Sequence, residues 1–265
     1  MSTLKEVPAS LGSKTCLITG GAGALGKVVA KAFLRAGASV VICDIYKERL
    51  SQALEELASL GSLTAFLGDI TSQQGVHRLF NNIKAKLGKL DILVNNARIA
   101  DQFQPVGDLD IDEWHQVIST NLTAPMLLSR LAVRSMLDGP NPSGCIINMA
   151  SAASKASMIA GAAYTASKHG LLRLIKHTAA FYRDKGIGYV ALLLGLMPES
   201  HISKRMTNVH PEGWQLASKI MSANDIKAIK MESVAGFCIS LVKDNCRLCN
   251  GTSISADRGF TCVLG

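Results

Sequence analysis

Tyr164 and Lys168 lie four residues apart at the end of the stretch SAASKASMIAGAAYTASK, which begins at Ser151. The apolar spacing of the following residues predicts a helix from Ala162 to Phe181, on which side chains four apart share one face. A free tyrosine has a pKa of about 10, too high for efficient proton transfer at neutral pH. A neighbouring ammonium favours the phenolate. The pair is therefore a candidate proton-transfer centre, although Tyr-x3-Lys alone also arises by chance.

A second candidate site is the glycine-rich stretch TGGAGALG, from Thr19 to Gly26. It lies between a strand predicted from Lys14 to Thr19 and a helix predicted from Leu25 to Ala36. Glycines at such a turn let the backbone approach a pyrophosphate, which the N–H groups and the dipole of the helix stabilise. The pattern predicts nucleotide contacts by Gly20, Gly23, Leu25 and Gly26. A merely tight turn is the alternative, and Ala24 stands where the usual spacing has another glycine.

Acidic residues follow the next two predicted strands. Asp44 stands 18 residues after Gly26, where a carboxylate can accept hydrogen bonds from both ribose hydroxyls and repel a 2′-phosphate. This favours NAD over NADP, although Lys47 lies nearby and leaves NADP possible. Asp69 can accept from an adenine amino group or simply cap the next helix. Ile45 and Ile70, which follow these aspartates, are assigned to the same cofactor-binding set.

Short apolar runs alternate with longer amphipathic segments through the whole chain. The predicted strands are 14–19, 39–43, 63–67, 91–94, 144–149, 189–194 and 251–255, and the predicted helices are 25–36, 47–60, 72–87, 111–137, 162–181 and 231–242. Strands separated by helices indicate βαβ units, and therefore an α/β, doubly wound parallel sheet with helices on both faces. We expect one domain over residues 1–265. Residues 196–230, rich in Met and Pro, break the alternation and are predicted to be a substrate lid, with a surface helical hairpin or a subunit contact as alternatives.

Composition excludes several classes of function. Apolar residues make up 48% of the 265 residues and charged residues 18%, with a formal charge of +8. The Lys and Arg residues are scattered, so we expect neither nucleic acid nor a membrane as a partner. Cys16, Cys43 and Cys145 fall in apolar runs as small buried hydrophobes, and the lone pair Cys246 and Cys249 gives no metal site. Without a signal-peptide pattern or an 18-residue apolar run, we expect a soluble cytoplasmic protein in a reducing compartment.

Taken together, these motifs resemble the short-chain dehydrogenase/reductase family, classical type with an Asn-Ser-Tyr-Lys tetrad. The resemblance rests on Thr19–Gly26, Asp69, Asn95-Asn96-Ala97, Asn121, Ser151, Tyr164 and Lys168, and it covers nearly the whole chain. It implies a Rossmann-type sheet of about seven strands, a nicotinamide cofactor and a homotetramer or dimer. It adds Asn96, Ala97, Tyr164, Lys168 and Gly195 to the residues expected to bind the cofactor.

The resemblance also implies a role for each catalytic residue. Tyr164 would protonate a carbonyl oxygen during reduction or act as the base in the reverse direction, and Ser151 would hydrogen-bond the same oxygen. Lys168 would lower the pKa of Tyr164 and bind the nicotinamide ribose. Asn121 would hold a water that links Lys168 to solvent. The alternatives left open are a strand-end cap for Ser151 and a helix-bending role for Asn121.

The sequence departs from the family pattern at three places. Arg98 replaces a glycine after Asn95-Asn96-Ala97; it could anchor an acidic substrate or contact a cofactor phosphate, but we expect it to point to solvent. Leu194-Gly195 replaces the usual Pro-Gly, with Glu199 near the position of a threonine. Residues 256–259 replace Asp-Gly-Gly, which could alter a subunit interface.

The sequence therefore predicts an NAD(P)-dependent oxidoreductase. It would interconvert a secondary alcohol and a ketone on a largely apolar, cyclic small molecule. The alternative is a non-redox isomerase or cyclase of a specialised-metabolite pathway that keeps the nucleotide as a scaffold. A non-catalytic nucleotide-sensing protein is a third and weaker hypothesis. Fold and tetrad are shared across many chemistries, so the substrate does not follow from them.

Overall fold

The computed structural model describes residues 11–198, 206, 208–224, 226–242 and 246–263. Their strands are β1 (Thr15–Thr19), β2 (Ser39–Asp44), β3 (Leu63–Leu67), β4 (Ile92–Asn95), β5 (Gly144–Ser151), β6 (Ile187–Leu194) and β7 (Ser253–Ala256). Their helices are α1 (Ala24–Arg35), α2 (Lys47–Leu57), α3 (Gln73–Leu87), α4 (Ile111–Ile118), α5 (Ala124–Leu137), α6 (Ala162–Tyr182), α7 (Pro211–Ala223), α8 (Met231–Ser240) and α9 (Cys246–Leu248). The predicted alternation of strands and helices is confirmed, with small shifts at the ends.

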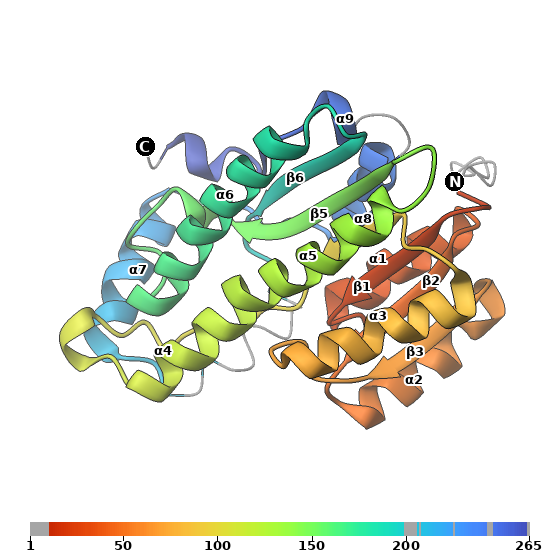
Figure 1. Ribbon diagram of the computed structural model, residues 1–265. Coiled ribbons are helices and arrows are strands. Elements are labelled where there is room, and N and C mark those ends of the chain that lie inside the picture. The colour runs from red at the N-terminus through yellow and green to blue at the C-terminus, as the bar shows by residue number, and fades with distance from the viewer. Residues whose placement is uncertain (1–10, 199–205, 207, 225, 243–245, 264–265) are drawn as a thin grey trace, which may run out of the picture.

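The strands form one parallel sheet in the order β3-β2-β1-β4-β5-β6-β7. One apolar core packs α1, α2 and α8 on one face, and a second core packs α3, α5 and α6 on the other (Figure 1). Strands buried on both faces need continuous apolar runs, and all eight residues of β6 are buried. The chain order reverses between β1 and β4, where a crevice opens at the carboxyl ends of the strands. The predicted doubly wound α/β fold is confirmed.

The predicted helix from Ile111 to Leu137 is interrupted. Between α4 and α5 lies a π-helical turn, Ser119–Thr123, in which the N–H of Ala124 donates to the carbonyl of Ser119. Pro125 accounts for the turn, because it has no N–H for the carbonyl of Asn121 four residues earlier and its ring would clash there. Asn121, predicted to lie on a continuous helix, therefore lies in this widened turn.

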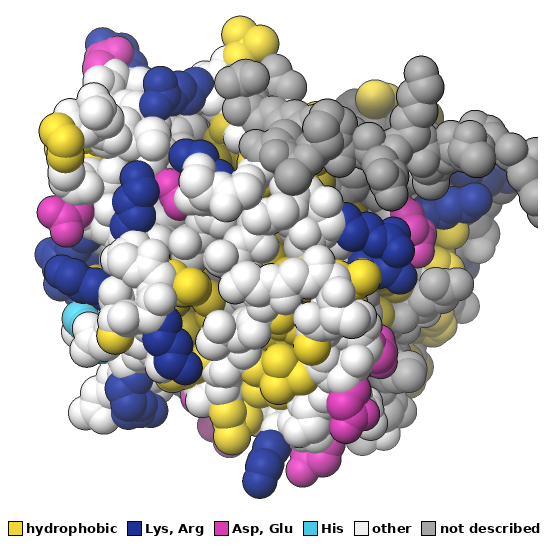
Figure 2. Space-filling view, turned by 90° about the vertical axis from the view of Figure 1, so that its right-hand side faces the viewer, with side chains coloured by type: hydrophobic (Ala, Val, Ile, Leu, Met, Phe, Trp, Pro, Cys, Tyr) yellow, Lys and Arg dark blue, Asp and Glu magenta, His cyan; other side chains and the backbone are white. Residues whose placement is uncertain are grey.

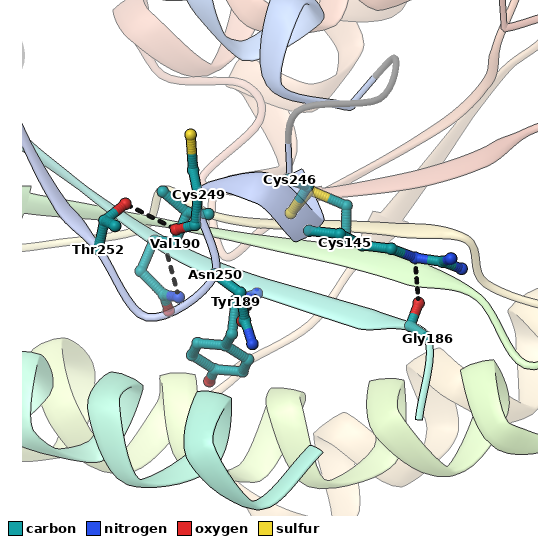
Figure 3. Close-up of a disulfide and its surroundings, with 10 residues drawn as sticks. Cys145, Gly186, Tyr189, Val190, Cys246, Cys249, Asn250 and Thr252 are labelled. Atoms are coloured by element: carbon teal, nitrogen blue, oxygen red, sulfur yellow. Dashed lines mark hydrogen bonds between the residues drawn. A yellow bond between two sulfur atoms is a disulfide. The ribbon is translucent and has the colours of Figure 1, made fainter. Parts of the chain in front are cut away.

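The cysteines depart from the expectation. Cys145, predicted to be a free buried hydrophobe, forms a disulfide with Cys246 of α9, and the two Cα atoms are 6.0 Å apart (Figure 3). The partners lie 101 residues apart in the chain, so no local pattern could pair them. Cys249 is a free thiol that points away from the bridge, and Cys16 and Cys43 are free and buried as predicted. The disulfide differs from the expectation that all cysteines are free thiols, and the reducing compartment stays a prediction.

Charged side chains are spread over the surface. On the face shown in Figure 2, Lys and Arg lie in several separate groups among other side chains. Within the described residues, no helix is both long and apolar enough to cross a bilayer. The same residues contain no group of three or more His, Cys, Asp or Glu side chains that could hold a metal ion.

Candidate active site

A groove of about 850 Å³ opens at the carboxyl ends of β1, β2, β3 and β4. It contains ten of the residues predicted to bind the cofactor, namely Gly20, Gly23, Leu25, Gly26, Asp44, Ile45, Asp69, Ile70, Asn96 and Ala97. The helix α1 begins in this groove with no side-chain cap and no acidic residue in its first turn. The positive end of its dipole therefore faces the groove without an acidic side chain of its own, which favours an anion such as a pyrophosphate.

The glycines fit a close approach of the backbone. Gly20 has φ = +60°, a conformation that L side chains rarely adopt. A Cβ on Gly26 would lie 2.1 Å from the carbonyl oxygen of Gly20 and 2.7 Å from the Cα of Gly21. No side chain larger than hydrogen can stand there without moving the turn away from α1. The turn is thus packed closely against the start of α1, and its contact with a dinucleotide stays a prediction.

Asp44 lies at the predicted adenosine end of the groove and is buried. Its Oδ1 accepts the N–H groups of Ile45 at 2.8 Å and Tyr46 at 3.3 Å. Its Oδ2 has no hydrogen bond within the described chain, so it is the atom available to ribose hydroxyls. Arg49, which the sequence analysis missed, also lines the groove with its guanidinium carbon 4.2 Å from the centroid of the Tyr46 ring.

Asp69 does not cap the helix that follows it. Its Oδ1 accepts from the N–H and the hydroxyl of Thr71 at 2.8 and 2.7 Å, and Ser72 is the residue that caps α3 through the N–H of Gly75. The capping alternative for Asp69 is therefore wrong. Asp69 is exposed in the groove, where it can accept from a ligand.

Tyr164 and Lys168 share one face of α6, as the helical spacing predicted. The Lys168 Nζ lies 5.5 Å from the centroid of the Tyr164 ring and donates to the carbonyl of Met149 on β5 at 3.2 Å. Burial, followed by the charge of Arg98, lowers the pKa of Lys168 to about 7. Burial raises the pKa of Tyr164, against the lowering effects of the Arg98 charge and of a side-chain hydrogen bond with Ser151. The effect of Lys168 on the pKa of Tyr164 stays a prediction.

Ser151 ends β5, where it is within hydrogen-bonding reach of Tyr164. Its Oγ also accepts the N–H of Ala153 at 3.2 Å, so it caps the short helix that follows, and the two readings of this residue are compatible. Asn121 is fully buried. Its side chain bonds both backbone groups of Ile99, at 3.0 and 2.9 Å, and donates to Ser167 on α6 at 3.3 Å. It therefore ties the π-helical turn to the site.

Asp101 is a buried residue of the site that the sequence analysis missed. Its carboxylate accepts the N–H of Gly161 at 3.0 Å, of Tyr164 at 2.8 Å and of Phe103 at 3.3 Å. Gly161 is the N-cap residue of α6, so Asp101 holds the start of this helix from 60 residues away in the sequence. Burial raises the pKa of Asp101 despite these hydrogen bonds. No local pattern marks it, because all but one of its partners lie in a distant segment.

Arg98 does not point to solvent, so that expectation was wrong. Its Nη1 donates to the carbonyl and to the side-chain oxygen of Asn96, both at 3.2 Å. The side chain is half-buried, and burial lowers the pKa of its guanidinium. Arg98 lines the cofactor groove and also the neighbouring pocket that contains Tyr164. It therefore stands between the two cavities.

The neighbouring pocket has a volume of about 250 Å³ and is lined in part by Ser151 and Tyr164. Its other lining is mostly apolar and includes residues of the predicted lid, namely Met197, Pro198, Met206, Trp214 and Met221. Trp214, on α7, packs edge-on against Phe103 with their ring centroids 5.0 Å apart. Glu199 and His201, which the sequence analysis considered, lie outside the described residues.

The remaining departures from the family pattern lie at Leu194-Gly195 and in the turn after β7. Leu194 and Gly195 line this pocket, and the N–H of Gly195 donates to the carbonyl of Ala256 at 3.2 Å. Asp257 is buried and closes the turn after β7 by accepting the N–H groups of Gly259 and Thr261 at 3.0 and 3.1 Å. Gly195 thus faces the pocket rather than the groove, and its contact with the cofactor stays a prediction.

Comparison with known proteins agrees with this geometry. The sequence profile described as short chain dehydrogenase matches residues 14–208. The short chain dehydrogenase/reductase dpchG of Colletotrichum higginsianum is 48% identical, over the whole length of both chains. The 3beta-hydroxysteroid dehydrogenase 2 of Eggerthella lenta is 31% identical over 98% of this chain and 99% of its own. A crystal structure of a short-chain type dehydrogenase/reductase from Mycobacterium marinum superposes with a TM-score of 0.84 at 25% identity, covering 96% of this chain and 98% of its own.

Proposed function

Because the chain belongs to the short-chain dehydrogenase family of oxidoreductases, we propose that it uses NAD to interconvert a secondary alcohol and a ketone. The observation that carries this proposal is the junction of the two cavities. Ser151 and Tyr164 line an apolar pocket, and Arg98 is shared between this pocket and the groove that contains the residues predicted to bind the cofactor. A largely apolar, cyclic substrate suits the lining of that pocket, and a relative named as a hydroxysteroid dehydrogenase acts on such a molecule.

The residues of the chain would divide the work as follows. The nicotinamide, when bound, supplies hydride chemistry. Tyr164 gives a proton to the carbonyl oxygen in reduction and takes one from the alcohol in oxidation. Ser151 donates a hydrogen bond to the same oxygen and holds the carbonyl in place. Lys168 holds the cofactor ribose, and Asn121 keeps the proton path to solvent in place. Residues 196–230 would cover the substrate.

Turnover of NADH with cyclic ketones, or of NAD with cyclic secondary alcohols, followed at 340 nm, tests this proposal. Tyr164→Phe should lose activity by at least about 100-fold, since general acid–base catalysis contributes about that much or more, while the protein stays folded. Phe181→Leu, an exposed position on α6, is the matched control and should keep full activity. Undiminished turnover by Tyr164→Phe would remove this residue from the mechanism.

Cofactor choice needs its own measurement, because Asp44 and Arg49 act in opposite directions. The free Oδ2 of Asp44 favours an unmodified ribose, whereas Arg49 would attract a 2′-phosphate. Titrations of NADH and NADPH by fluorescence should show tighter binding of NADH. Asp44→Ala should reduce the difference, and tighter binding of NADPH by the unchanged protein would contradict the assignment.

The second candidate function is a non-redox isomerisation or cyclisation in which the nucleotide serves as a scaffold. Arg98 favours it, because a half-buried cation beside Tyr164 could support acid chemistry without hydride transfer. This function requires product formation with no net change of cofactor, supported equally by NAD and NADH. Consumption of one cofactor per product molecule would exclude it.

A further inference from the structure

Arg98 is the one charged side chain that lines both the nucleotide groove and the apolar pocket, within the part of the chain that the structure describes. Its neighbour Asn96 donates from Nδ2 to the carbonyls of Thr19 and Gly20 in the glycine-rich turn, and in the described part of the chain Arg98 is linked to this turn only through Asn96. The redox function proposed above does not use Arg98.

Among the described residues, the guanidinium has no carboxylate partner. Nη1 donates to two neutral oxygens of Asn96, at 3.2 Å each. Removing a cation from water costs several kcal/mol unless an anion or enough hydrogen bonds compensate it. A half-buried guanidinium with one satisfied nitrogen is therefore poised for an anionic partner.

The pocket itself does not supply that partner. Asp101 is its one carboxylate among the described residues, and both Asp101 oxygens accept backbone N–H groups of the loop and of α6. Ser151 and Tyr164 are neutral in their resting forms, and the rest of the wall is mostly apolar. An occupant of this pocket would meet apolar surface on most sides and a cation at the edge of the groove.

We propose that Arg98 binds a carboxylate, or an equivalent anionic oxygen, on the apolar molecule that occupies this pocket. The planar guanidinium can hold such a group through two parallel hydrogen bonds, which neither a neutral ketone nor a hydroxyl can match. This inference rests on the proposed function only in taking the 250 Å³ pocket as the substrate site. It makes the substrate an amphipathic acid, with its reacting carbon near Tyr164 and its charge at Arg98.

Binding of two matched probes tests the proposal without any turnover. The full-length protein, saturated with NADH, is titrated by calorimetry at pH 7.5 with 1-adamantanecarboxylate and with 1-adamantanecarboxamide. Both are rigid apolar cages, and they differ in one charged group. The carboxylate should bind at least about tenfold more tightly, because a hydrogen bond to a charged group contributes more than one to a neutral group.

Variants assign this preference to one side chain. Arg98→Met should give equal affinities for the two probes, whereas Arg98→Lys should keep part of the preference because the charge remains and the fork is lost. Arg78→Met, an exposed position on α3, is the control and should keep the whole preference. Circular dichroism confirms that each variant is folded.

The inference is overturned by equal affinities in the unchanged protein, by a preference that survives Arg98→Met, or by no binding of either probe. A carboxylate preference that arises only in Tyr164→Phe would identify the Tyr164 phenolate as the partner of Arg98 and would also refute it. Loss of turnover in Tyr164→Phe with an intact preference separates the two proposals, because the redox function and the anion site are then tested independently.

Discussion

Removal of the Asp101 carboxylate should destabilise the start of the helix that carries Tyr164. Asp101 is buried and accepts three backbone N–H groups, two of which belong to Gly161, the N-cap of α6, and to Tyr164 in its first turn. Each buried donor left without a partner costs about 1–3 kcal/mol. Water can enter from the pocket and compensate part of this loss, so we expect Asp101→Ala to lower the free energy of unfolding by about 3 kcal/mol.

A conservative change gives a graded result. Asp101→Asn keeps one acceptor oxygen, so it can still accept from Gly161 or from Tyr164 but not from both in the observed geometry. We expect the free energy of unfolding to fall by about 1–2 kcal/mol, which is less than in the alanine variant. Activity should fall with stability in both variants, because the N–H of Tyr164 is among the groups held.

Urea unfolding followed by far-UV circular dichroism measures these free energies. Asp138→Ala, an exposed position at the end of α5, is the control and should stay within about 0.5 kcal/mol of the unchanged protein. A loss below about 1 kcal/mol for Asp101→Ala would refute the reasoning, since it would mean that water satisfies the N–H groups as well as the carboxylate does.

Three further perturbations follow from particular contacts. Gly26→Ala should weaken NADH binding and lower the free energy of unfolding by about 1–3 kcal/mol, because the new Cβ would lie 2.1 Å from the Gly20 oxygen. The control Gly236→Ala on α8, where nothing lies within 4 Å of the new Cβ, should be neutral or stabilising. Loss of the Cys145–Cys246 disulfide by double alanine substitution should lower the free energy of unfolding by up to about 4.7 kcal/mol for a loop of roughly 100 residues. The control Cys262→Ala removes an exposed free thiol and should leave the free energy of unfolding unchanged. An unfolding midpoint unaffected by dithiothreitol would show that the bridge does not form in solution. The folded-state pKa of Lys168 is about 7, below its ordinary value of 10.5, so the folded protein binds fewer protons than the unfolded chain between these values. The free energy of unfolding should therefore rise with pH across this window, and the rise should be absent in Lys168→Met; an equal rise in both proteins would contradict the assignment.

The sequence predicted the local parts of the site well. Hydrophobic periodicity distinguishes strands from helices, so the positions of the glycine turn, of Asp44 and of the Tyr164 helix could be read directly. Parallel strands end at the same edge of a sheet, and this rule alone places those segments together. The substrate-lid interpretation of residues 196–230 stays a prediction, although Met197, Trp214 and Met221 of this segment line the apolar pocket.

Contacts between distant segments were beyond the sequence. Asp101 meets α6 across 60 residues, and Cys145 meets Cys246 across 101. The direction of Arg98 was predicted wrongly, because a long charged side chain ordinarily favours water and the sequence gives no sign of the Asn96 oxygens that hold it inside. Each of these outcomes depends on which surfaces pack together.

The order of elements, the doubly wound sheet and the spacing of the nucleotide and tyrosine motifs were thus determined by the sequence itself, since they follow from periodicity and chain order. Only the tertiary structure decided the electrostatics of the site. Burial and the nearby Arg98 charge lower the pKa of Lys168 to about 7, and burial raises the pKa of Tyr164. Desolvation and close approach are properties of the packed fold, and no single stretch of the chain contains them.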